Sequence, residues 1–167
     1  RVVIVDDHTL FREGLRRILE MEEDIVVVAD AENAEDIVEL VWQTKPDVLL
    51  LDIRMPQGSG LDALPAVLRI SPRTQVLVLT ACDEKEEHVR AFKLGAKGVV
   101  LKDPARQTLM QAIHTVVTGQ VWVDPRMAGV LVEEISHLPA AGGGSSTRDE
   151  NGLTERELEI VRLVASG

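Results

Sequence analysis

The sequence is poor in cysteine and in aromatic residues. Its 167 residues include one cysteine, Cys82, no tyrosine, two phenylalanines and two tryptophans. A single cysteine excludes an internal disulfide and a cysteine-rich zinc site, which fits the reducing cytosol, and we expect a cytoplasmic protein. Because rings are so scarce, the 45% of hydrophobic residues must build the core mainly from valine, leucine, isoleucine and alanine. That mixture is typical of an α/β interior of ordinary size.

Positive charge and long apolar runs are scarce as well. Lysine and arginine total 18 against 28 aspartates and glutamates, so the formal net charge is -10. Because affinity for nucleic acids rests largely on basic residues, this balance argues against a dominant polyanion-binding surface, and any DNA-binding part must be small or missing. No apolar run approaches the roughly 20 residues of a membrane span, so we expect no membrane partner. The chain opens on Arg1 without an initiator methionine, and we expect a trimmed piece of a longer protein.

What the sequence does contain is a regular alternation of strand-like apolar runs and segments of helical period. The expected strands are Val2–Val5, Ile25–Ala29, Val48–Asp52, Gln75–Leu79 and Gly98–Leu101. Each is followed by an expected helix, over residues 10–19, 37–45, 60–71, 84–94 and 105–119. Five strand-then-helix units predict an α/β fold with a doubly wound, flavodoxin-like parallel sheet of five strands, in the order 2-1-3-4-5, and helices on both faces.

Single residues predict details of three of these helices. Pro65 is expected in the first turn of the third helix, where its missing N–H is not needed. Gly95 follows the fourth helix and is expected to be its C-terminal cap. The apolar spacing of the fifth helix, from Leu109 to Val117, fits core packing, although one side of this helix could also form a dimer surface.

Beyond residue 119 the alternation stops. We expect a short helix over Asp124–Ser136, started by Pro125, and a flexible linker over residues 138–152, which are rich in glycine and serine. Thr154 and Glu157 form a capping box that opens an amphipathic helix running to the end of the chain. The predicted organisation is a domain over residues 1–118, a linker with a short helix over 119–152, and the first helix of a truncated all-α domain over 153–167.

Three carboxylates should meet at one edge of the predicted sheet, where open α/β sheets bind their ligands. Asp6 and Asp7 follow the first strand and Asp52 ends the third, its neighbour in the doubly wound order. Their charges repel, so protons or a divalent cation must be shared, and Mg²⁺ fits best because it is hard and prefers oxygen. Thr80 and Lys102 end the fourth and fifth strands and bring a hydroxyl and an ammonium to this edge. Asp52 is therefore the candidate nucleophile toward a phosphoryl group.

These residues resemble the receiver domain of two-component response regulators. The resemblance covers about residues 1–118. It rests on residues at four strand ends, all in order: Asp6-Asp7, Asp52 followed by Met55-Pro56, Thr80-Ala81 and Lys102. It implies that Asp52 accepts a phosphoryl group from a sensor histidine kinase in a Mg²⁺-dependent reaction.

The resemblance also implies a role for each site residue. The implied ligands of Mg²⁺ are Asp7, Asp52 and the backbone carbonyl of Arg54, with Asp6 acting through water. The implied phosphoryl-binding and switch residues are the hydroxyl of Thr80, the ammonium of Lys102 and the small Ala81, beside which the phosphoryl group would enter.

The remaining motifs are similar to one branch of that family. Residues 95–103, Gly-Ala-Lys-Gly-Val-Val-Leu-Lys-Asp, and residues 153–167 look like the NarL/FixJ subfamily with a LuxR-type helix-turn-helix, which implies control of transcription. The recognition helix, which would enter the major groove, would lie beyond residue 167, so we expect DNA binding only from the full-length C-terminal domain. One position departs from the family. Val99 stands where an aromatic residue usually rotates inward on activation, so a ring-flip readout is absent there.

Phosphorylation is expected to act as a switch. Added negative charge should draw Thr80 and Lys102 inward and change the surface formed by the fourth helix, the fifth strand and the fifth helix. We expect a homodimer to form through this surface. Beyond self-phosphorylation and self-dephosphorylation, we expect no enzyme activity.

Three other features have simpler explanations than function. His8 could be a metal ligand or a phosphohistidine, but we expect it in the first helical turn. Cys82 follows Thr80 by two residues, yet such a residue is more often an inert loop cysteine. Residues 58–63 match the dinucleotide fingerprint G-x-G-x-x-A, but they follow the third strand instead of the first, and loop flexibility beside Asp52 explains the glycines.

Two other functions compete with the regulator. A phosphatase with an aspartate nucleophile needs a second acid two residues later to protonate the leaving group, and Arg54 occupies that place. A relay receiver with no DNA output is disfavoured by residues 153–167.

Overall fold

The computed structural model describes residues 1–56, 58–81, 84–102 and 105–124. The chain divides into two compact units, Arg1–Trp122 and Val123–Gly167, and nearly all of the described residues belong to the first. The segment predicted as a linker with a short helix, 119–152, is described only as far as Asp124. The rest of that segment and the helix predicted over 153–167 lie outside the described residues, as does Cys82. In the part of the chain that the structure describes, no helix is both long and apolar enough to cross a membrane.

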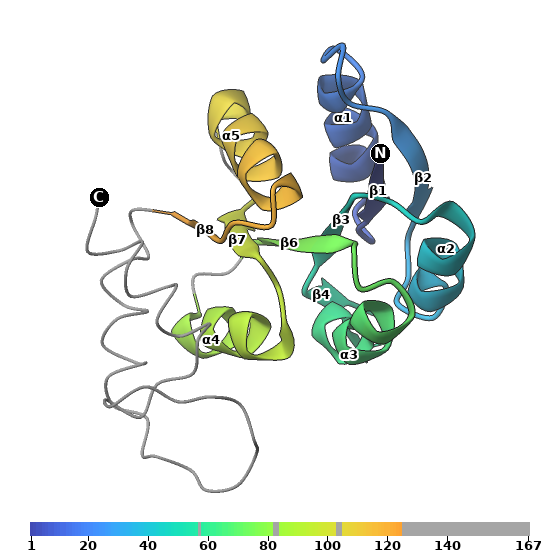
Figure 1. Ribbon diagram of the computed structural model, residues 1–167, viewed down its shortest axis with the longest axis vertical. Coiled ribbons are helices and arrows are strands. Elements are labelled where there is room, and N and C mark those ends of the chain that lie inside the picture. Colours follow the sequence, from blue (N-terminus) through green and yellow to red (C-terminus); the bar gives the residue numbers. More distant parts are fainter. Residues whose placement is uncertain (57, 82–83, 103–104, 125–167) are drawn as a thin grey trace, which may run out of the picture. The chain divides into compact units, whose positions relative to one another are not determined.

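A twisted sheet forms the centre of the first unit (Figure 1). Its strands are β1 (Val2–Val5), β2 (Val27–Ala31), β3 (Val48–Asp52), β6 (Gln75–Thr80), β7 (Gly98–Leu101) and the short β8 (Trp122–Val123), in the order β2-β1-β3-β6-β7-β8. The pairs among the first five are parallel. This confirms the predicted doubly wound order, to which β8 adds a sixth strand through a 2.8 Å hydrogen bond from the Trp122 N–H to the Lys97 carbonyl.

Helices cover both faces of this sheet. They are α1 (Thr9–Leu19), α2 (Ile37–Thr44), α3 (Gly60–Ile70), α4 (Lys85–Leu94) and α5 (Arg106–Val117). The helices α1 and α5 lie on one face, and α2, α3 and α4 lie on the other (Figure 1). Alternate strand residues such as Ile4, Leu50 and Val100 pack in one core cluster with α1 and α5. Every residue of β1 and β3 is buried, which accounts for the continuous apolar runs of these strands, Val2–Val5 and 48–51; only Asp52, at the end of β3, is charged.

The strand β2 begins two residues later than predicted, at Val27 instead of Ile25. Ile25 is buried, at 7% exposure, but its N–H closes a turn onto the Glu22 carbonyl at 3.4 Å. The apolar run therefore marks where the chain is buried, and ladder pairing starts only once the turn is complete.

The prediction for Pro65 is wrong, because Pro65 lies inside α3 and not in its first turn. The helix begins at Gly60, as expected: the Gly60 N–H donates to the Ile53 carbonyl at 2.8 Å, and the Ser59 hydroxyl accepts from the Leu61 N–H at 3.3 Å. Pro65 has no N–H to donate to the carbonyl four residues earlier, so the helix loses that hydrogen bond. By contrast, Gly95 ends α4 with a φ of 116°, which confirms it as the cap.

A short antiparallel hairpin of β4 (Arg54–Met55) and β5 (Gly58–Ser59) connects β3 to α3. Gly58 has a φ of 137°, which other residues rarely adopt. A Cβ atom at Gly60 would collide with the backbone carbonyl oxygen of Asp52. These glycines are therefore required by the tight path of the chain around Asp52, and not by the loop flexibility that we expected.

Candidate functional site

Strand register and side-chain alternation bring acidic and basic residues together at the carboxyl edge of the sheet. Ile4 of β1 pairs with Leu50 of β3, and both belong to the core on the side of α1 and α5. Asp6 and Asp52 each follow two residues later, so alternation directs both carboxylates to that side. Lys102 follows the end of β7 two residues after Val100, which belongs to the same core, so alternation directs its side chain to that side as well.

Lys102 bridges two buried carboxylates. Its Nζ atom donates to Asp52 Oδ2 at 2.6 Å and lies 2.8 Å from Asp6 Oδ2. The side chains of Asp6 and Asp52 are 0% and 3% exposed, and that of Lys102 is 10% exposed. Asp7 adds a third carboxylate, which is 22% exposed. One ammonium therefore faces more negative charge than it can neutralise.

Burial raises the pKa of Asp52 above its usual range, because the carboxylate loses its contact with water. The hydrogen bond and charge of Lys102 act against this increase, and the negative charge of Asp6 adds to it. A 3.3 Å hydrogen bond from the Arg54 N–H to Asp52 Oδ1 also favours the charged form. The raised pKa means that burial outweighs the single ion pair.

The donor set fits a hard divalent cation. One ligand atom each from Asp6, Asp7, His8 and Asp52 lies within 4.8 Å of the others. Asp6 Oδ2 and Asp7 Oδ1 are buried and accept no hydrogen bond, although Lys102 Nζ lies 2.8 Å from the first and His8 Nδ1 lies 2.9 Å from the second. Mg²⁺ prefers such carboxylate oxygens. The acidic cluster that the sequence predicted is thus present.

The other predicted residues lie around this cluster. Thr80 is buried at the end of β6, and its carbonyl accepts the Lys102 N–H at 2.7 Å, which ties the ends of β6 and β7 together. Ala81 is exposed. The Arg54 guanidinium lies 2.6 Å from Glu84 Oε1, just before α4. Val99 is buried, at 1% exposure.

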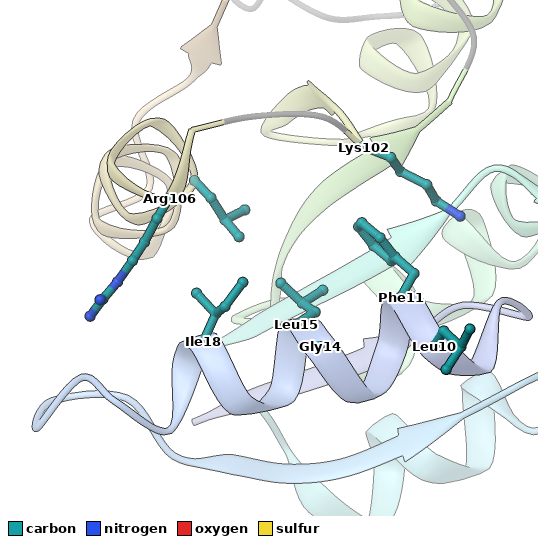
Figure 2. A pocket seen from close by; sticks show the side chains of 8 residues that line it. Leu10, Phe11, Gly14, Leu15, Ile18, Lys102 and Arg106 are labelled. Atoms are coloured by element: carbon teal, nitrogen blue, oxygen red, sulfur yellow. The ribbon is translucent and has the colours of Figure 1, made fainter.

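Sequence reasoning missed two neighbours of the site. His8 is not in the first turn of α1 but is its N-cap residue, and the imidazole lies beside Asp7. The Nζ atom of Lys102 lies 5.1 Å from the centre of the Phe11 ring, within the range of a cation–π contact. A groove of about 250 Å³ between α1 and α5 opens at this point, where Lys102 runs above Phe11 (Figure 2).

Comparison with known proteins identifies the family. The model of the response regulator receiver domain matches residues 2–114. The chain belongs to this family. Over its whole length, the receiver chain is 36% identical to the transcriptional regulatory protein DegU of Brevibacillus brevis and covers 75% of that relative.

Solved structures agree with this assignment. The receiver superimposes on a LuxR-family response regulator from Aurantimonas sp. SI85-9A1 with a TM-score of 0.75 and 31% identity, covering 80% of this chain and 96% of that one. The signal receiver domain of the putative response regulator NarL from Mycobacterium tuberculosis gives a TM-score of 0.68 and 38% identity, with 72% and 97% covered. The receiver is therefore of the NarL/FixJ type, whose members regulate transcription through a DNA-binding output domain.

Proposed function

We propose that Asp52 accepts a phosphoryl group from a sensor histidine kinase in a Mg²⁺-dependent reaction. The observation that carries this proposal is the buried Asp52 carboxylate, held 2.6 Å from the ammonium of Lys102 at the carboxyl end of β3. A carboxylate in that position has a partner for the oxygens of an incoming phosphoryl group, and its neighbours can hold the cation that such chemistry needs.

In the proposed reaction, a carboxylate oxygen of Asp52 forms a bond to phosphorus while the bond from phosphorus to the donor's imidazole nitrogen breaks. The electron pair leaves with the imidazole. The Lys102 ammonium and the Thr80 hydroxyl would bind phosphoryl oxygens, and the exposed Ala81 leaves the approach past the end of β6 open.

We propose that Asp7, Asp52 and the backbone carbonyl of Arg54 hold Mg²⁺, and that Asp6 acts through water. When bound, the ion supplies positive charge that offsets the carboxylates and the phosphoryl oxygens. Residue 54, two positions after Asp52, is an arginine that pairs with Glu84, and a guanidinium cannot serve as the acid that protonates the leaving group of an outside substrate. We therefore propose self-phosphorylation and self-dephosphorylation as the only chemistry.

Phosphorylation would add about 1.5 to 2 negative charges where Lys102 now bridges Asp52 and Asp6. Because the Lys102 N–H donates to the Thr80 carbonyl, a shift at one of these residues moves the end of the other's strand. Such a shift would favour the second of two conformations, form a homodimer and control transcription through a C-terminal DNA-binding domain.

The test is the intact mass of the protein after incubation with acetyl phosphate, with Mg²⁺ or with EDTA. We expect the mass of one phosphoryl group to be added only with Mg²⁺, and no addition to Asp52→Asn. A control variant, Asp62→Asn, removes an exposed carboxylate of α3 that pairs with Arg90 at 2.6 Å, and it should be phosphorylated normally. An adduct on Asp52→Asn, or none on the wild type with Mg²⁺ shown to bind, would contradict the proposal.

A further inference from the structure

The side chain of His8 is turned toward the carboxylates at the edge of the sheet. The residue is the N-cap of α1, yet its side chain caps no backbone N–H. Its own N–H donates to Asp6 Oδ1 at 2.8 Å, which fixes the backbone beside the cluster. The imidazole is 65% exposed, and its Nδ1 atom lies 2.9 Å from Asp7 Oδ1 and 3.5 Å from Asp6 Oδ1. A half-exposed ring that faces two carboxylates can therefore share a cation with them.

We propose that His8 Nδ1 is a nitrogen ligand that extends the site from hard cations to transition-metal cations such as Zn²⁺ and Ni²⁺. This inference rests on the divalent-cation site of the proposed function. Mg²⁺ is held by oxygen atoms, whereas imidazole suits Zn²⁺ and Ni²⁺, and carboxylates complete many such sites. An imidazole beside Asp7 therefore changes which metal the cluster prefers.

A second observation indicates that carboxylate oxygens of the cluster are available to bind a cation. Asp6 is 0% exposed and its Oδ2 atom accepts no hydrogen bond, and Asp7 Oδ1 is likewise buried and accepts none. A buried carboxylate oxygen without a hydrogen bond is costly unless a cation satisfies it. Lys102 lies near Asp6 Oδ2, but it does not meet Asp7 Oδ1, which has His8 as its neighbour.

Lys102 lies close to the proposed ligand atom, since its Nζ atom is 3.5 Å from His8 Nδ1. Its shorter contacts are with Asp52 Oδ2 at 2.6 Å and with Asp6 Oδ2 at 2.8 Å, on the buried side of the cluster. A cation held through Asp7 and His8 would therefore replace the ammonium at His8 Nδ1, while Lys102 would keep both buried carboxylates as partners. Coordination uses the lone pair of Nδ1, so the ring proton must reside on Nε2, and any proton on Nδ1 is released to solvent.

Calorimetric titration of tag-free protein with Zn²⁺ and, separately, with Mg²⁺ tests this assignment. We expect His8→Gln to weaken Zn²⁺ binding about tenfold or more, by analogy with the loss of groups that support metal ligands, and to leave Mg²⁺ binding unchanged. His114→Gln is the matched control. It removes an imidazole on α5 that lies 2.9 Å from the Asp24 carboxylate, outside the cluster, and it should change neither affinity.

A direct readout is the ¹⁵N resonance of the His8 ring. Zn²⁺ should shift the Nδ1 resonance strongly, and Mg²⁺ should not. Unchanged Zn²⁺ affinity in His8→Gln, an equal loss for both ions, or Zn²⁺ binding that survives Asp7→Asn would each overturn the proposal. Circular dichroism of each variant checks that the fold is kept. Failure of wild-type protein to bind Mg²⁺ would instead contradict the proposed function, so the two failures are distinguishable.

Discussion

At the scale of single residues, an excess of negative charge dominates the electrostatics of the site. Among the described residues, Lys102 is the one lysine or arginine that forms ion pairs with both Asp6 and Asp52, and Asp7 lies beside them. Burial raises the pKa of Asp52 in spite of the Lys102 ion pair. Without metal, the folded protein therefore holds a carboxylate that would be better solvated in the unfolded chain.

Asp52→Asn should stabilise the metal-free protein at neutral pH. A carboxyl whose pKa is raised by folding contributes stability below its unfolded pKa, about 3.9, and loses it as the pH rises through the folded value. Asparagine cannot ionise, so it avoids this loss. We expect an increase of about 1 kcal/mol in the free energy of unfolding at pH 7, shrinking as the pH falls toward 4, measured by urea denaturation in EDTA.

Asp62→Asn is again the control. Its carboxylate is exposed and pairs only at the surface, so its effect should be small at either pH. A lower stability of Asp52→Asn at pH 7 would mean that the bond to Lys102 contributes more than burial costs.

Much of the site could be predicted from the sequence, because polar residues at the ends of parallel strands must share an edge. Asp6, Asp52 and Lys102 meet as expected for that reason. The position of His8 could not be predicted, since it depends on whether α1 begins at residue 8 or 9. That difference of one residue decides where the imidazole points.

At the scale of elements, two glycines in helices should respond in opposite ways to substitution by alanine. At Gly60, the new Cβ would collide with the Asp52 carbonyl at the start of α3, so we expect a loss of about 2 kcal/mol or more. At Gly14 in α1, the new Cβ would meet nothing within 4 Å. There alanine should stabilise the helix by about 0.5–1 kcal/mol.

Thermal or urea denaturation of the two variants measures this difference. If Gly60→Ala were as stable as the wild type, the close approach of Gly60 to the Asp52 carbonyl would be contradicted. If Gly14→Ala were destabilised, the finding that Gly14 borders open space in the groove of Figure 2 would be contradicted.

The fold was predictable at this scale because apolar runs and helical periods are both long and regular. The order β2-β1-β3-β6-β7 is the common doubly wound order that we expected. The two-residue strands β4, β5 and β8 could not be predicted, because so short a segment has no period. The expected start of α3 at residue 60 is confirmed, and a helix that starts there already has Pro65 beyond its first turn, so the prediction for Pro65 did not follow from its own helix bounds.

At the scale of the whole molecule, we expect phosphorylation to change the oligomeric state. Sedimentation velocity with acetyl phosphate and Mg²⁺ should convert monomer to dimer, because the added charge shifts the conformation of the surface formed by α4, β7 and α5. The sedimentation of Asp52→Asn should not change under the same conditions. Unchanged sedimentation of a protein whose mass shows full phosphorylation would refute the proposed dimer formation but not the proposed phosphorylation of Asp52.

Asp52, and neither of its acidic neighbours, is the proposed acceptor of the phosphoryl group. Reduction of the phosphorylated protein with borohydride converts an aspartyl phosphate to homoserine, and peptide mass mapping then locates the changed residue. We predict homoserine at Asp52 alone, and only after incubation with both acetyl phosphate and Mg²⁺. Homoserine at Asp6 or Asp7, or an unchanged Asp52 in protein that carries the added mass, would contradict the assignment of Asp52 as the phosphoryl acceptor.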